Sequence, residues 1–251
     1  MEVVGLWRYP VKSLQGQALT VVDVESDGLA GDRLWGILDD RTGRILTARR
    51  RPELLTASAQ YIGDVPVISL PDGTMTNGPG HATDAVLSDW LKSPVSLVPS
   101  AGVNDGRAEY FEDATDDTSA AIEWTMPADR YVDAAPVLML TTASLEAGRS
   151  LHPDGNWDVR RFRPNIVVAH PGAGWVEDAW VGQSVSVGTV QLSPMQPCVR
   201  CTMVTRPQLG IETDVEIFRA LARHHGGLFG VWCDVVSTGT VRIGDPIGLE
   251  P

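Results

Sequence analysis

The 251-residue sequence predicts a β-rich α+β fold made of barrel-like lobes. Short apolar segments recur between turn-forming residues, and few stretches have helical spacing, which is typical of lobes built from β-sheet. At roughly 150 residues per domain, the length fits one large domain or two small ones. With 43% hydrophobic and 21% charged residues, the composition is that of a soluble globular protein rather than a disordered or fibrous one.

The first part of the chain is predicted to form short strands separated by turns. The expected strands span residues 3–9, 19–24, 34–39, 44–48, 57–61, 67–70 and 74–76. Residues 40–43, with the sequence Asp-Arg-Thr-Gly, indicate a hairpin between two of these strands. Residues 82–91 then place Ala85, Leu87 and Leu91 on about one face of a helix, with Thr83 as its expected cap.

Residues 101–133 form an acidic stretch, which we interpret as a solvated loop or linker between two lobes. The stretch has few aliphatic side chains and only two basic ones, Arg107 and Arg130. Its nine acidic residues are Asp105, Glu109, Glu112, Asp113, Asp116, Asp117, Glu123, Asp129 and Asp133. The alternative interpretation is an acidic docking surface for a basic protein.

Beyond this stretch, short strands alternate with two predicted helices. The helices span residues 142–151 and 215–224, and Leu145 and Leu151 are expected to face inward from the first of them. The expected strands span residues 137–140, 165–169, 185–187, 190–194 and 240–243.

The charge balance argues against polyanionic partners. Twenty Lys and Arg against 32 Asp and Glu leave a net charge of -12, which disfavours binding to nucleic acid or an anionic membrane. Only Lys12 and Lys92 are lysines, so a specific anion site would depend mainly on arginine. No secretory signal is visible, and no apolar run reaches the roughly 20 residues that span a bilayer. We therefore expect a cytoplasmic protein.

Three cysteines, Cys198, Cys201 and Cys233, make a poor disulfide framework. The Cys-x-x-Cys pair could be half of a zinc site, a thiol–disulfide couple, or one metal ligand beside a bystander thiol. Zinc would need further ligands from Cys233, His224 or His225. A redox couple should start a helix, whereas residues 202–205 are expected to continue as a strand. Both thiols could also be buried core residues, although a guanidinium beside Cys201 would favour the thiolate.

Basic side chains at predicted strand ends are a second candidate set. They are Lys12, Arg33, Arg160, Arg161 and Arg163, with the hydroxyl of Ser13 beside the first. Such arginines could form a solvated surface, but the guanidinium fork also presents paired donors to phosphate oxygens. No glycine-rich phosphate loop accompanies them, so side chains would hold an anion here.

Several short motifs together resemble the MOSC family, and in particular its amidoxime-reducing members in mitochondria and bacteria. The matching segments run in the family's order over nearly the whole chain. They are Tyr9–Ser13, Gly31–Trp35, Thr47–Arg49, Arg161–Val168, Arg200–Cys201, Phe229–Gly230 and Gly239–Pro246.

This resemblance implies an N-terminal MOSC-associated β-barrel domain over residues 1–115 and a MOSC domain over residues 116–251. It also implies a molybdenum cofactor in a cleft between the lobes, with Cys201 as the catalytic thiolate ligand of molybdenum and Cys198 as a non-ligating neighbour. The residues implied to bind the cofactor are Lys12, Ser13, Arg33, Arg163, Asn165, Arg200 and Trp232.

The implied activity is the reduction of small N-hydroxylated compounds. Some bacterial relatives carry a ferredoxin-like domain that this sequence lacks, so electrons would come from a separate electron-transfer protein. The alternatives are a carrier of the molybdenum cofactor, a sulfur-transfer protein with a persulfide on Cys201, and a structural zinc protein.

Two departures from the family pattern concern the substrate and the proton donor. Thr205 and Arg206 replace an acidic residue of the reductases, which bears on substrate scope. Ala134 and Ala135 stand where relatives commonly place a hydroxyl beside the cofactor. Asp133 is a candidate proton donor by position, and a solvated loop carboxylate is the alternative. His81, His152 and His170 are interpreted as surface or structural residues, and the His224–His225 pair as a helix C-terminal cap.

Overall fold

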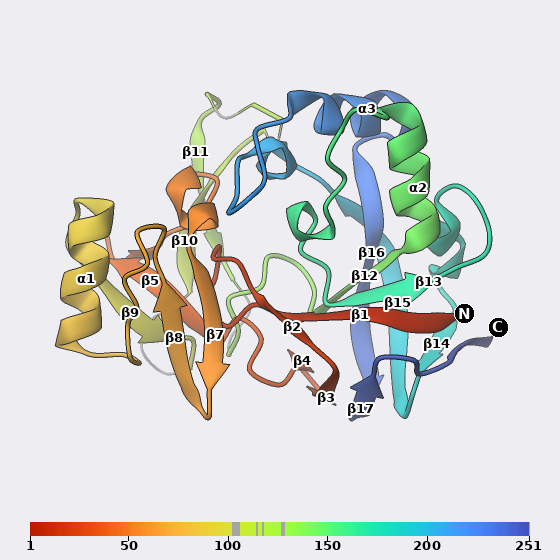
Figure 1. Cartoon of the computed structure of the whole chain (residues 1–251), viewed down its shortest axis with the longest axis horizontal. Helices are drawn as coiled ribbons and strands as arrows, with labels where there is room; N and C mark the ends of the chain where they lie inside the picture. The colour runs from red at the N-terminus through yellow and green to blue at the C-terminus, as the bar shows by residue number, and fades with distance from the viewer. Residues whose placement is uncertain (102–105, 114, 117, 127–128, 251) are drawn as a thin grey trace.

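The structure has a smaller lobe, formed by residues 35–125, beside a larger lobe formed by residues 2–29 and 137–250 (Figure 1). It is a computed structural model that describes residues 1–101, 106–113, 115–116, 118–126 and 129–250. Among these residues, no helix has the length and apolar character of a membrane-spanning segment.

An eight-stranded sheet forms the frame of the larger lobe. Its strands, in spatial order, are β18 (Ile247–Glu250), β14 (Ser184–Val187), β15 (Val190–Val199), β16 (Leu228–Ser237), β12 (Val137–Thr141), β13 (Ile166–Ala169), β1 (Glu2–Arg8) and β2 (Gln17–Leu19). Neighbours are antiparallel except β12 and β13, which are parallel. The strands β1 and β2 from the start of the chain therefore complete a sheet whose other six strands come from the second half of the chain.

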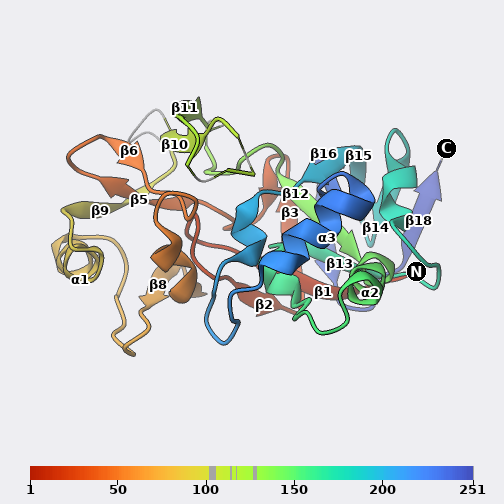
Figure 2. The same ribbon diagram turned by 90° about the horizontal axis from the view of Figure 1, so that it is seen from above.

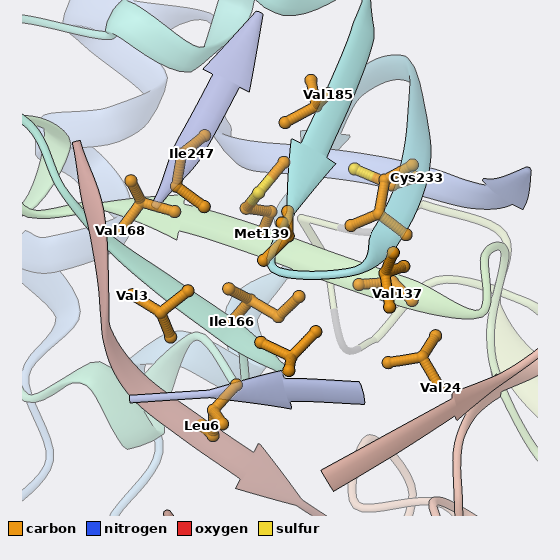
Figure 3. Packing of buried hydrophobic residues seen from close by; sticks show 14 of the residues in the cluster. Val3, Leu6, Val24, Val137, Met139, Ile166, Val168, Val185, Cys233 and Ile247 are labelled. Carbon is orange, nitrogen blue, oxygen red and sulfur yellow. The ribbon is translucent and has the colours of Figure 1, made fainter. Parts of the chain in front are cut away.

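The larger sheet curls around a core of valine, isoleucine and leucine side chains (Figure 3). Val3, Met139 and Ile166 in this core are fully buried, and burial of such apolar area supplies much of the folding free energy. A three-stranded sheet of β3 (Val21–Glu25), β4 (Gly28–Leu29) and β17 (Gly239–Arg242) covers the same core. The ends of the large sheet approach through an isolated bridge between Glu2 and Pro246. The sheet is therefore barrel-like, but its strands do not close into a continuous barrel.

The smaller lobe contains a five-stranded sheet, a hairpin and one helix. The sheet order is β11 (Ala121–Thr125), β10 (Arg107–Phe111), β6 (Arg44–Ile45), β5 (Trp35–Asp39) and β9 (Val95–Pro99). The hairpin is β7 (Ser58–Ile62) with β8 (Val65–Ser69), and the helix is α1 (His81–Leu91), preceded along the chain by the 3-10 helix η1 (Pro52–Thr56). Ile37, Leu54 and Leu87 belong to a core separate from that of the larger lobe.

Two further helices lie on the larger lobe, whereas α1 lies at the far end of the smaller lobe (Figure 2). The helix α2 (Thr142–Leu151) is capped by the Thr141 hydroxyl, and α3 (Val215–His225) is capped by the Asp214 carboxylate. Gly226, in the left-handed conformation, ends α3. Both helices bury a cluster of aromatic side chains that includes Trp157, Phe162 and Phe229.

The predicted fold class is confirmed. It is a β-rich α+β fold with an N-terminal β-barrel-like lobe followed by a second barrel-like lobe, whose larger sheet stays open as described. The division at residues 115 and 116 stays a prediction. Most predicted strands and all three predicted helices are present, whereas β4, β9, β10, β11, β16 and β18 were not predicted. The segment predicted as one strand over 19–24 is broken at Thr20, and residues 74–76 form only an isolated bridge between Ser69 and Met75.

The interpretation of residues 101–133 as a loop is wrong for residues 107–111 and 121–125, because β10 and β11 form a hairpin there, while the other described residues of the stretch are turns or irregular chain. Glu109 and Glu123 lie directly opposite each other in this hairpin, and such like charges disfavour pairing. Arg44 of the neighbouring strand forms ion pairs with both carboxylates and removes the repulsion. Asp105 and Asp117 of the acidic set lie outside the described residues.

Three local predictions are also corrected. Thr83 is not the cap of α1, because the helix begins two residues earlier and the Thr83 hydroxyl donates to the Gly78 carbonyl at 2.5 Å. Leu151 is 37% exposed, since it is the last residue of α2. Residues 202–205 form the 3-10 helix η4 (Thr202–Thr205) instead of a strand. The Arg161 guanidinium holds this turn by donating to the carbonyls of Val204 and Arg206.

The contact of Gly148 with Trp157 gives a stability prediction. A Cβ atom at position 148 of α2 would overlap the Trp157 ring. Although alanine favours a helix over glycine by about 1 kcal/mol, overpacking a core costs about 1–3 kcal/mol. We expect Gly148→Ala to lower the free energy of unfolding in a urea titration. The exposed Ser150→Ala on the same helix is the control and should stay within about 0.5 kcal/mol of the parent. Equal stability of the two variants would contradict the packing.

Candidate functional site

A cleft lies where loops of the smaller lobe meet the strand ends of the larger lobe. All eight residues predicted from the sequence line it: Lys12, Ser13, Arg33, Arg163, Asn165, Arg200, Cys201 and Trp232. Lys12 and Ser13 lie between β1 and β2, Arg33 precedes β5, Arg163 precedes β13, Cys201 follows β15, and Trp232 lies in β16. The fold thus brings together five separate segments of the chain, while the roles of these residues stay predictions.

Three of these residues have a strained backbone. Ser13, Arg33 and Arg163 have φ angles of 69°, 53° and 53°, and they are three of only five non-glycine residues with positive φ in the described chain. This left-handed region is unfavourable for residues with a Cβ atom and persists only where the surroundings impose it. Such strain concentrates at functional sites, so the conformation supports a site here.

Arg33 and Arg163 form a cationic cradle around the ring of Tyr9. Their guanidinium carbons lie 4.8 Å and 4.3 Å from the ring centroid. The buried carboxylate of Asp32 pairs with Arg33 and also accepts from the Tyr9 amide at 2.7 Å, while Arg163 donates to the Leu14 carbonyl at 2.6 Å. Burial and the nearby charge of Arg33 lower the pKa of Arg163 to about 10. A bound anion would offset both effects, so the cradle is suited to a phosphate.

Lys12, Asp133 and Tyr110 form a hydrogen-bonded cluster across the cleft. The Lys12 ammonium pairs with Asp133 Oδ1, and the Tyr110 hydroxyl donates to the same oxygen at 2.5 Å. Burial raises the pKa of Asp133, but the charge of Lys12 and the hydrogen bonds from Lys12 and Tyr110 outweigh it and hold that pKa at about 2. The Asp133 side chain lies in a loop and is 62% exposed, as a solvated loop carboxylate would be, and at this pKa it holds no proton to donate near neutral pH. Its role at this site is to accept hydrogen bonds.

Arg200 and Asn165 direct their polar atoms to the protein itself. Arg200 donates to the carbonyls of Phe229 and Phe162 at 2.6–2.9 Å. The Asn165 amide oxygen accepts from the Leu138 amide at 3.1 Å and from Arg33 at 3.4 Å, and its nitrogen donates to a strand carbonyl. These contacts fix the cleft wall. Arg161 likewise binds only carbonyls in its described contacts. Of the neighbouring arginines Arg160, Arg161 and Arg163, only Arg163 therefore belongs to the cradle.

The two thiols of the Cys-x-x-Cys pair differ in exposure. Cys198 is 3% exposed, and burial raises its pKa to about 11. Cys201 is partly exposed to the cleft. Burial raises its pKa too, although the Met203 amide and the charges of Arg49 and Arg200 act in the opposite direction. The neighbouring Arg200 guanidinium thus acts in the expected direction and favours the thiolate, but burial outweighs it in the free protein. Coordination of a soft metal ion would deprotonate this thiol.

The zinc alternative finds no ligand set in the described residues, where no group of three or more His, Cys, Asp or Glu could hold a metal. Cys233 is fully buried in the core of the larger sheet. His225 binds the Asp178 carboxylate at 2.6 Å and the Leu228 carbonyl at 2.8 Å, and its ring stacks on Trp175. This histidine is committed to structure.

Tyr110 and Arg49 line the cleft but were not among the predicted site residues. Arg49 belongs to the motif Thr47–Arg49, which carried part of the family resemblance and could have signalled it. Tyr110 lies in the acidic segment interpreted as a loop, so nothing in the sequence placed it near Cys201.

Comparisons with known proteins show which family models and relatives the chain matches. The MOSC domain model matches residues 128–248, and the MOSC N-terminal beta barrel domain model matches residues 1–98. Mitochondrial amidoxime-reducing component 1 of Mus musculus is 29% identical, over 98% of this chain and 82% of that protein. The Homo sapiens protein of the same name is 27% identical over the same shares. The crystal structure of the YuaD protein from Bacillus subtilis covers 99% of this chain and 94% of its own, with 12% identity and a TM-score of 0.47.

The Tyr110–Asp133 hydrogen bond gives a testable pKa. In a carbon-13 NMR titration, the Asp133 carboxyl should titrate at about 2, below its ordinary value of 3.8. Because the folded-state pKa is depressed, the stability that this carboxylate contributes is complete above its ordinary pKa and is lost as the pH falls toward 2. Tyr110→Phe should raise the midpoint and lower stability near neutral pH. Tyr61→Phe, whose ring packs against Arg8 and does not line the cleft, is the control. An unchanged midpoint in Tyr110→Phe would contradict the cluster.

Proposed function

The chain belongs to the MOSC family, and from this membership and the residues of the cleft we propose that it is a molybdenum-dependent reductase of N-hydroxylated compounds. One observation carries the proposal: a cationic cradle and a cleft-exposed thiol lie in the same cleft. The amidoxime-reducing names of its relatives indicate the substrate class. Electrons would come from a separate electron-transfer protein.

The donor set suits the molybdenum cofactor. Its phosphate would lie among Lys12, Ser13, Arg33 and Arg163, whose charges meet the desolvation cost of a buried anion. Its molybdenum, already held by sulfur, would take the soft thiolate of Cys201 as a further ligand. Arg200 and Asn165 would position the wall through their main-chain contacts, and Trp232 of β16 would contribute an aromatic surface.

When bound, the cofactor would supply the two-electron chemistry that cleaves the N–O bond. Two protons are also consumed, and the products are the N–H compound and water. The described side chains would bind and orient the substrate. Asp133, held ionised by Lys12 and Tyr110, offers an acceptor for the N–H or O–H of the substrate. A different group or a water molecule would deliver the protons, since Asp133 carries none near neutral pH.

Turnover separates this proposal from the carrier alternative. We expect the loaded protein to contain about one molybdenum and to oxidise a reduced dye when benzamidoxime is added, with benzamidine as the product. Stoichiometric molybdenum with no turnover of any N-hydroxylated compound would instead support a carrier. A persulfide on Cys201 by mass spectrometry, without molybdenum, would support sulfur transfer.

The two thiols should respond differently to mutation. Cys201→Ala should lose benzamidoxime reduction and most of the bound molybdenum, because it removes the proposed metal ligand. Cys198→Ala is the matched control and should keep both, since its thiol is buried beside the cleft and makes only a weak contact with the Val199 carbonyl. Metal analysis and dye oxidation on both variants measure the difference. Full molybdenum and full activity in Cys201→Ala would overturn the ligand assignment.

The cradle should govern retention of the cofactor. Arg163→Met removes a buried charged donor, and hydrogen bonds to charged groups contribute about 1.5–3 kcal/mol. We expect roughly tenfold to hundredfold weaker binding, measured as pterin fluorescence released after gel filtration. Arg160→Met, which removes an ion pair with Asp158 at the surface, is the control. Equal pterin content in the two variants would exclude Arg163 from the phosphate site.

A further inference from the structure

Arg49 is a cleft residue that forms no ion pair among the described residues, although its charge acts on the Asp113 carboxylate and lowers its pKa. It follows β6, and its Nη2 donates to the Asp113 main-chain carbonyl at 3.2 Å. Its guanidinium carbon lies 5.8 Å from the centroid of the Tyr110 ring and 5.4 Å from that of Phe111. Its Nε atom is buried and has no hydrogen-bond partner. A buried charged donor without an acceptor is costly.

Other cations of the cleft have partners or belong to the cradle. Lys12 pairs with Asp133, and Arg33 pairs with Asp32. Arg163 also meets no carboxylate in its described contacts, but it lies in the cradle proposed for the phosphate. Arg49 therefore differs from these cations. It has a donor without a hydrogen-bond partner, and the proposed cofactor site does not include it.

Arg49 lies toward the Cys201 side of the cleft. Its charge acts on the pKa values of Cys201 and Tyr110, lowering both. The cations that act on Lys12, by contrast, are Arg33 and Arg163. Arg49 lines the same cleft as Cys201, and its guanidinium lies near the ring of Tyr110, whose hydroxyl binds Asp133.

We propose that Arg49 binds a carboxylate of the substrate, so that the preferred substrates are N-hydroxylated compounds that also carry a carboxylate. The planar guanidinium fork matches a carboxylate in geometry. Such a ligand would give the Arg49 guanidinium, which forms no ion pair among the described residues, a carboxylate partner. This inference rests on the proposed reductase function and specifies its substrate class.

A pair of substrates that differ only in this group tests the inference. In steady-state assays of the loaded protein, 4-carboxybenzamidoxime should have a kcat/KM roughly tenfold or more above that of benzamidoxime. The difference should lie mainly in KM. Arg49→Met should abolish the preference. Arg50→Met is the matched control and should keep it, because the neighbouring Arg50 is exposed and lies by Glu109 and Phe111.

A binding measurement makes the test independent of turnover. Calorimetric titration with 4-carboxybenzamidine should show binding to the loaded parent protein and to Arg50→Met, and roughly tenfold weaker binding to Arg49→Met. If the parent protein reduces neither amidoxime, the proposed function fails, while the titration still reports on the carboxylate site. Equal kcat/KM for both substrates in the parent protein, a preference that survives in Arg49→Met, or loss of molybdenum from Arg49→Met would each overturn the inference. The last result would place Arg49 with the cofactor.

Discussion

The antiparallel pairing of β1 with β13 is the interaction on which the cleft depends. Leu6 pairs with Ile166 in this ladder, so the segment that follows β1 lies beside the segment that precedes β13. Tyr9, just after β1, donates its hydroxyl to the carbonyl of Pro164, just before β13, at 3.1 Å. A one-residue slip would turn the buried faces of both strands outward. The hydrophobic core therefore fixes the register, and the register places Lys12 and Ser13 against Arg163.

The same geometry explains how an acidic protein maintains an anion site. The chain has a net charge of -12, yet its cleft gathers basic side chains from segments distant in sequence. Two carboxylates, Asp32 and Asp133, orient Arg33 and Lys12 and limit their mutual repulsion. Other arginines of the region, Arg161 and Arg200, satisfy main-chain carbonyls and hold the wall. The local field thus differs in sign from the overall charge.

The fold class and most strands of the larger lobe follow from alternating apolar residues, because burial of one sheet face leaves that pattern in the sequence. The hairpin of β10 and β11 does not follow from such a pattern, since its opposed Glu109 and Glu123 pair with Arg44, which is more than 60 residues away in the chain. Nor does the turn at residues 202–205, whose β-branched composition favours a strand until Arg161 binds its carbonyls. The family motifs located the eight predicted residues in one cleft. They did not separate side chains that face a ligand from those, such as Arg200, that bind the main chain, because this depends on tertiary contacts.

The left-handed backbone at Ser13, Arg33 and Arg163 has a consequence for the thermodynamics of loading. Few conformations near this region are open to residues with a Cβ atom, so the three backbones have little freedom left once the surrounding loops are in place. The conformational entropy of ordering the binding loops is then lost during folding and not when the ligand enters. Binding to such a preorganised site has a smaller entropic cost, and the protein can hold its ligand without a large rearrangement of the main chain.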